Sequence, residues 1–161
     1  CVLLSRYNYK NLGLYRQTGS YRLQEIDGRT LSKDEILSFS LHNQSQKDYY
    51  CYLINIAYDG AIYAMFPNPK DRVESARLKK GEMRQLLKEV VLPLTELGEE
   101  TIKVITSNHP IDASLFEQAP FDRDALNPLE QLVVNAVHGS RRQTSIKYDE
   151  WATEQISFRV K

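Results

Sequence analysis

The chain has little of the chemistry that marks most enzymes and metal proteins. It holds two cysteines among 161 residues, too few for a disulfide scaffold or a four-thiolate zinc site. Its seven glycines are scattered singly, so no glycine-rich loop is available to cradle a phosphate. Neither a Gly-x-Ser-x-Gly elbow nor a His-Glu-x-x-His helix motif is present. We therefore expect no catalytic residue, no metal and no cofactor.

Net charge is also missing, because 21 basic side chains balance 21 acidic ones. This balance argues against a nucleic-acid partner and against a polybasic membrane adapter. Apolar residues, in contrast, are plentiful: 42% of the chain is hydrophobic and 10% is aromatic. That content excludes a disordered chain, and the length fits one domain with its own core. We predict a single domain over residues 1–161.

The chain starts at Cys1 rather than at a methionine. A cysteine in this place is what remains after a bacterial lipoprotein signal is removed, but Val2-Leu3-Leu4 lacks a small, polar tether. No secretory signal is visible. Two interpretations stay open: an arbitrary start within a longer bacterial protein, and a lipid-anchored envelope protein. The compartment is undetermined, with the cell envelope or periplasm favoured over the cytoplasm.

Residues 49–66 carry a single charge and are long enough to suggest a transmembrane helix. Asp59-Gly60 near their middle, between β-branched and aromatic runs, predicts a β-hairpin instead. A two-residue turn there pairs Ile56 with Tyr63. Both faces are apolar, so the hairpin should lie centrally in a sheet covered on both sides. Pro67 should end its second strand.

Alternation of apolar and polar residues predicts the other strands. They are residues 36–42, an edge strand at 90–94, residues 101–107, a C-terminal strand at 155–161 and a weaker candidate at 21–25.

Two helices are predicted. Asn127 as cap, Pro128 in the first turn and Glu130 three residues after the cap favour a helix over residues 128–138. A second, shorter helix is expected around residues 78–88. Runs of strands with one or two short helices favour a mainly β fold, an antiparallel Greek-key β-sandwich of immunoglobulin type.

The motifs in the middle of the chain occur in a characteristic order. A tyrosine-rich strand, Tyr50–Ile56, is followed by Asp59-Gly60 and then by Phe66-Pro67-Asn68. This order resembles the bacterial domain-of-unknown-function family 4384 over a core of about residues 33–107. The resemblance implies an accessory domain attached to another unit, notably a caspase-like peptidase, a kinase or an envelope protein. It brings no activity and no catalytic residues.

The leading hypothesis is a non-catalytic accessory domain that binds a protein, a peptide or an adjoining domain of the same chain. Tyrosine is enriched both in strands and at interfaces, so the candidate partner surface is formed by Phe66, Asn68, Tyr49 and Tyr50.

Two alternatives remain. One is an envelope lipoprotein or surface-binding module anchored through Cys1. The other is a thiol hydrolase that uses Cys51 with His109 or His138. Cys51 lies in the middle of a predicted central strand, where a free cysteine is usually a small buried hydrophobe.

Overall fold

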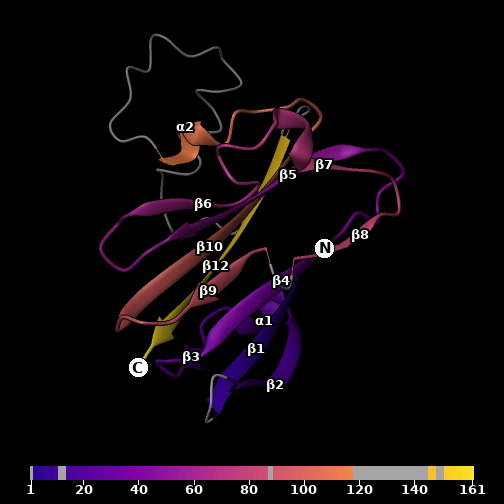
Figure 1. Cartoon of the computed structure of the whole chain (residues 1–161). Coiled ribbons are helices and arrows are strands. Elements are labelled where there is room, and N and C mark those ends of the chain that lie inside the picture. The colour runs from indigo at the N-terminus through magenta and orange to yellow at the C-terminus, as the bar shows by residue number, and fades with distance from the viewer. Residues whose placement is uncertain (1, 11–13, 87–88, 118–144, 148–150) are drawn as a thin grey trace.

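The computed structural model describes residues 2–10, 14–86, 89–117, 145–147 and 151–161, and it folds as two packed β-sheets with short helices (Figure 1). The predicted mainly β sandwich is confirmed. Its Greek-key, immunoglobulin-type connectivity stays a prediction. The predicted helix 128–138 lies outside the described residues.

In the described part of the chain, the first sheet has five strands in the order β2-β1-β4-β8, with β9 also paired to β4. These strands are β1 Val2–Lys10, β2 Leu14–Arg22, β4 Ile36–His42, β8 Met83–Gln85 and β9 Val91–Pro93.

The second sheet, over the same described residues, has seven strands in the order β11-β12-β10-β5-β6, with β3 parallel to β12 and β7 beside β5. The strands are β3 Thr30–Leu31, β5 Tyr49–Ile56, β6 Ile62–Phe66, β7 Arg77–Leu78, β10 Gly98–Ser107, β11 Ser145–Lys147 and β12 Trp151–Val160. The described helices are α1 Leu23–Ile26, the 3-10 helix η2 Val73–Ala76 and α2 Ser114–Glu117.

The main core lies between the two sheets. Side chains of alternate residues in β1, β4, β5, β10 and β12 fill it, as the period of a strand requires. Its buried members include Leu4, Leu37, Phe39, Leu53, Ile102, Ile156 and Phe158.

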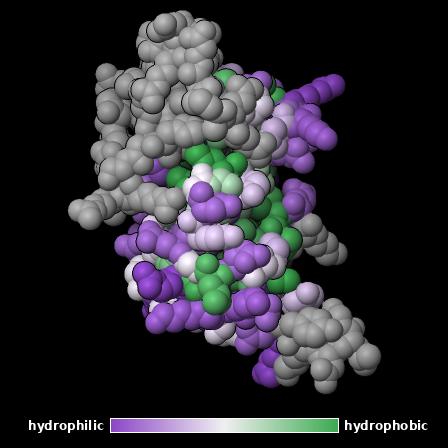
Figure 2. Space-filling view, turned by 90° about the vertical axis from the view of Figure 1, so that its left-hand side faces the viewer, coloured by the Kyte–Doolittle hydropathy of each residue, from purple (hydrophilic) through white to green (hydrophobic). Residues whose placement is uncertain are grey.

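A second, smaller core covers the opposite face of the second sheet. It is formed by Tyr52, Ile54, Ala76, Ile105, Ile111, Ala113 and Phe116. On the side of the molecule that carries β6 and α2, hydrophobic side chains reach the described surface in separate patches bordered by hydrophilic residues (Figure 2). Most residues of β5 and β10, the central strands of the second sheet, are therefore buried on both faces.

Most strand predictions are confirmed. Strand β4 matches the predicted range 36–42, β9 is the predicted short edge strand, and β12 ends where the C-terminal strand was expected but begins earlier, at Trp151. Strand β10 contains the predicted 101–107, yet Ile105, expected on its polar face, is buried in the second core. A strand buried on both faces loses the alternation that identifies its inward side.

Two local predictions are wrong. Residues 78–88 were expected to form a helix, but this region contains β7 and β8, and Gly81 takes a φ of +75° in the turn between them. Residues 21–25 do not form one strand, because β2 ends at Arg22 and α1 begins at Leu23. Leu23 and Ile26, one helical turn apart, are both buried against the main core, which favours the helix.

The hairpin forms at the predicted place with a different register. The backbone N–H of Ala57 donates to the carbonyl of Ala61 at 2.8 Å, so the loop holds three residues and not two. Gly60 takes the left-handed conformation, with a φ of +87°, as the last residue of such a loop commonly does. Consequently Ile56 faces Ile62, not the predicted Tyr63.

This shift exchanges the faces of residues 62–64 of β6, and a second register shift next to Leu53 returns Phe66 to the main core. Ile62 and Ala64 pack on the second core, whereas Tyr63 is 53% exposed. Strand β5 is central and buried as predicted, but β6 ends the sheet order among the described strands. It stops at Phe66, before Pro67, as expected.

A largely buried ion pair links β1 to the residue that precedes β4. Arg6 donates from Nε and Nη2 to Oε1 and Oε2 of Glu35, at 2.8 and 2.9 Å. Glu35 is only 3% exposed, and its Oε2 also accepts the backbone N–H of Ser32 at 2.6 Å. Arg6 and Arg29 lie over the ring of Tyr21, at 5.9 and 5.3 Å from its centroid. The buried carboxylate is thus fully compensated.

Truncating Phe39 tests the assignment of the main core. Phe39 is 1% exposed, so Phe39→Ala should lower the free energy of unfolding by about 3–5 kcal/mol. Denaturant unfolding measures this change. Tyr63→Ala, an aromatic truncation at an exposed position, should cost less than about 1 kcal/mol. Equal losses from the two variants would contradict the assignment.

Candidate functional site

A cavity of about 140 Å³ lies between the two sheets, near the start of β5 and the end of β10. Its walls combine apolar and polar side chains. The lining residues are Val2, Leu41, Tyr49, Cys51, Leu78, Val104, Thr106, Ala152, Thr153 and Glu154.

The cavity exists because one row of the second sheet carries short side chains. Register places Cys51 beside Thr106, and Thr106 beside Ala152. On the opposite wall, Val2 of β1 pairs with Leu41 of β4. Short side chains cannot span the distance between two packed sheets, so a space remains.

The cavity has a buried floor and a partly exposed rim. Val2, Leu41, Cys51, Leu78 and Val104 are buried. The partly exposed lining residues are Tyr49, Thr106, Ala152 and Glu154. These four side chains form the solvent-facing rim, while Cys51 on the floor stays buried.

Glu154 is the unusual residue of this site. It lies beside Val104 in the next row of the sheet, on the inward face that Ile156 and Phe158 share. Its Oε1 atom is buried and has no hydrogen-bond partner, and burial raises the pKa of the carboxyl group. A buried polar atom without a partner requires an explanation, since nearly all such atoms in folded proteins are paired.

Sequence reasoning missed Glu154. The predicted C-terminal strand began at residue 155, one position too late to include it. Extending the same alternation backward places Glu154 on the inward face with Ile156 and Phe158. An acidic residue at an inward position of a strand was the available signal.

Cys51 is buried in the cavity floor, as predicted. It is 2% exposed, and burial raises the pKa of its thiol to about 12. Since the thiolate is the nucleophile, burial disfavours the reactive form of this cysteine. His109 is exposed just beyond the end of β10, and His138 lies outside the described residues. These features argue against the thiol hydrolase.

The two predicted partner tyrosines lie on opposite faces of β5. Tyr49 faces inward, lines the cavity and is partly buried, which raises the pKa of its hydroxyl to about 12. Tyr50 faces outward and donates its hydroxyl hydrogen to Oε1 of Glu74 at 2.9 Å. This hydrogen bond raises the pKa of Tyr50. Only Tyr49 belongs to the cavity.

The other two predicted partner residues also lie apart. Phe66 is 6% exposed and belongs to the main core, with the Arg84 guanidinium 5.7 Å from its ring centroid. Asn68 is exposed, and its Oδ1 accepts the backbone N–H of Lys70 at 3.0 Å. Its role in the structure is to form the turn after β6. The structure thus does not bring the four predicted residues together as one exposed surface.

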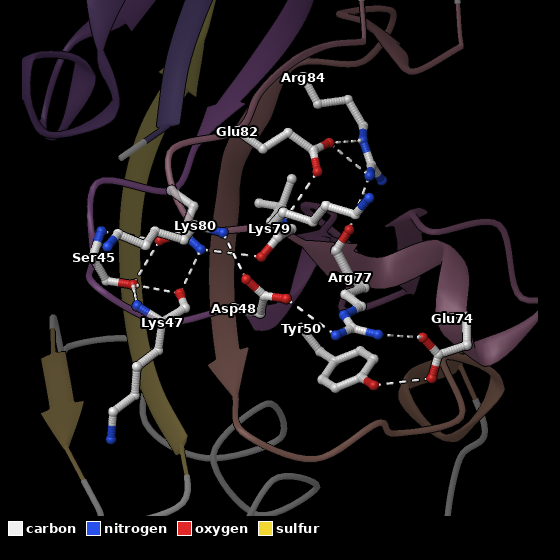
Figure 3. Close-up of polar contacts among 12 residues, drawn as sticks. Ser45, Lys47, Asp48, Tyr50, Glu74, Arg77, Lys79, Lys80, Glu82 and Arg84 are labelled. Carbon is white, nitrogen blue, oxygen red and sulfur yellow. Dashed lines mark hydrogen bonds and ion pairs between the residues drawn. The ribbon is translucent and has the colours of Figure 1, made fainter.

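Asp48, Arg77 and Glu74 form a polar network beside the start of β5 (Figure 3). Strand β7, which carries Arg77, pairs with β5, and its Leu78 is a cavity wall. Asp48 accepts the backbone N–H of Lys80 at 2.8 Å and the Arg77 guanidinium at 3.0 Å. These two hydrogen bonds lower the pKa of Asp48. The charges of Asp48, Arg77 and Glu74 are paired with one another.

Arg84 completes the network on the side of Phe66. It donates to Oε2 of Glu82 at 2.9 Å and to the carbonyls of Ser75 and Arg77, both at 2.8 Å. Its hydrogen-bonding capacity is largely used within the chain.

No protein-family model, no curated protein and no solved structure matches the chain. The resemblance to family 4384 therefore stays a prediction. Among the described residues, no cluster of His, Cys, Asp and Glu is arranged to hold a metal ion. The helices described are all too short or too polar to cross a membrane.

Thiol labelling tests the burial of Cys51. In a Cys1→Ser variant, which leaves Cys51 as the single thiol, labelling by a soluble disulfide reagent should be slow in the native state. It should become rapid only in denaturant, because burial keeps the group a neutral, inaccessible thiol. Absorbance of the released chromophore measures the rate. Rapid native labelling would revive the hydrolase hypothesis.

Replacing Glu154 by its neutral isostere tests the cost of the buried carboxylate. A carboxyl group whose pKa is raised on folding destabilises the protein at pH values above the folded-state pKa. Glu154→Gln should therefore raise the free energy of unfolding at pH 7 by up to about 1 kcal/mol. This gain should vanish as the pH falls below 4.5, the ordinary pKa of the group, because the native carboxyl is then neutral too.

Denaturant unfolding of the Glu154→Gln variant across this pH range provides the measurement. Glu99→Gln, an exposed glutamate of the same sheet, serves as the matched control and should change stability little at any pH. A loss of stability in Glu154→Gln at pH 7 would show that the carboxylate is already paired.

Proposed function

We propose that this chain is a non-catalytic binding domain that takes a protein or peptide partner at the end of the sandwich where the cavity opens. One observation carries the proposal: the cavity has a partly exposed rim and contains a buried, unpaired oxygen of Glu154. Pockets of this kind, apolar with a few polar groups, bind side chains or small ligands.

The nature of the lining supports recognition over catalysis. Catalysis by the one nucleophilic thiol in the lining would need a lowered pKa and an adjacent base. Burial instead raises the pKa of Cys51 to about 12. The polar network of Asp48 and Arg77 holds the wall of the pocket in place before any partner arrives, which reduces the ordering that binding costs.

We propose for this chain the setting that the resemblance to family 4384 implies, an accessory domain of a larger bacterial protein beside a peptidase or signalling unit. An envelope module anchored through Cys1 would use the same pocket, so the binding proposal holds for both settings.

Selection from a displayed peptide library tests the proposal. The full chain should enrich peptides that share a side chain, and Ala152→Leu, which fills the cavity, should abolish their binding. Ala61→Leu makes the same change at the β5–β6 turn, at the opposite end of β5, and should leave binding intact. Fluorescence anisotropy with the enriched peptides measures affinity, and denaturant unfolding verifies that both variants fold.

Two results would contradict the proposal. One is peptide binding that survives Ala152→Leu unchanged. The other is substrate turnover by the wild-type chain on a hydrolase panel that Cys51→Ala abolishes.

A further inference from the structure

We infer that the cavity is a pocket for a primary ammonium group on an alkyl chain, contributed by a lysine side chain of the partner and bound by Glu154. This inference rests on the proposed function and names the chemistry that the same site recognises.

The charge of the cavity lining favours a cation as the bound group. Among the described lining residues, Glu154 alone carries a charged side chain. The neighbouring charges are already used: Arg84 is bound by Glu82, and Asp48 by Arg77. The N-terminal ammonium offsets the charge of Glu154 only in part, since burial still raises the pKa of the carboxyl group. An incoming cation would therefore meet a partly compensated carboxylate, and a charge-assisted hydrogen bond is stronger than a neutral one.

Geometry selects an ammonium over a guanidinium. Only one carboxylate oxygen of Glu154, Oε1, is buried without a partner. A guanidinium gains most from a carboxylate that offers both oxygens in a bidentate pair, whereas an ammonium acts as a compact point charge and needs only one. The hydroxyl groups of Thr106 and Tyr49 belong to the same lining and provide further acceptors for its three hydrogens.

The size and the walls of the cavity fit the alkyl part of a lysine. The volume of about 140 Å³ far exceeds the roughly 10–15 Å³ that one water molecule needs by a comparable measure. Val2, Leu41 and Val104 are buried apolar walls, against which methylene groups pack favourably. The pocket thus matches a side chain that is apolar along its length and positively charged at its end.

Titration with small amines, followed by backbone amide chemical shifts, tests the inference. The probes are Nα-acetyl-lysine methylamide, the uncharged isosteric Nα-acetyl-norleucine methylamide and Nα-acetyl-arginine methylamide. Because Val2 lines the cavity, the chain used also carries a short Gly-Ser extension before Cys1, so that its own amino group does not compete.

We expect saturable shifts in β10 and β12 with the lysine probe, at a Kd on the order of 1 mM. Norleucine and arginine probes should bind about tenfold more weakly or not at all. Glu154→Gln should weaken lysine binding about tenfold, as the loss of one charge-assisted hydrogen bond predicts, and Glu99→Gln should not change it. Ala152→Leu should abolish binding of every probe.

A parallel titration with n-butylammonium distinguishes a lysine side chain of a partner from a free amine as the source of the bound ammonium group. If n-butylammonium binds more tightly than the lysine probe, the pocket serves a free amine and the assignment to a partner's lysine is wrong. No saturable shift with any amine, or equal affinity for lysine and norleucine, overturns the inference entirely.

The peptides enriched in the library distinguish this failure from failure of the proposed function. If they bind at the cavity but tolerate replacement of each lysine by norleucine, the binding function stands and the ammonium pocket is rejected. If Ala152→Leu has no effect on them, the proposed binding site is rejected whatever the amines do.

Discussion

The structure depends on one constraint, the pairing of β10 with a neighbouring strand on each side. All ten residues of β10 pair with β12, and seven of them also pair with β5. Because backbone groups are satisfied on both edges, both faces can be buried without cost to hydrogen bonding. Ile102 on one face joins the main core, and Ile105 on the other joins the second core. The two cores are thus organised around a single strand.

The same register determines the candidate site. It aligns Cys51, Thr106 and Ala152 in one row and brings Glu154 beside Val104 in the next. A shift by one residue would exchange the faces of a whole strand, so the inward position of Glu154 follows from the burial of Ile156 and Phe158 on the same strand. The pocket is therefore part of the packing of the sandwich and not an addition to its surface.

Alternation and turn signals predicted β4 of the first sheet and the longer strands of the second, because β4, β12 and the hairpin each carry a clear local pattern. The register of the hairpin was not predictable from Asp59-Gly60, since the same dipeptide suits a two-residue turn and, as here, the end of a three-residue loop. The β1–β2 hairpin went unpredicted, because β2 is a mostly polar, exposed strand. The pocket was hidden from sequence because its lining comes from six separate strands.

The pKa shifts around the cavity support the proposed role in recognition over a catalytic one. Burial raises the pKa of Tyr49, Cys51 and Glu154 alike, so the environment favours the uncharged form of each acid. Acid–base catalysis usually depends on neighbouring groups whose pKa values are moved apart, one toward the proton donor and one toward the acceptor. Uniform desolvation cannot create that difference. It does leave Glu154 less stable as an anion than it would be in water, a cost that the N-terminal ammonium offsets only in part.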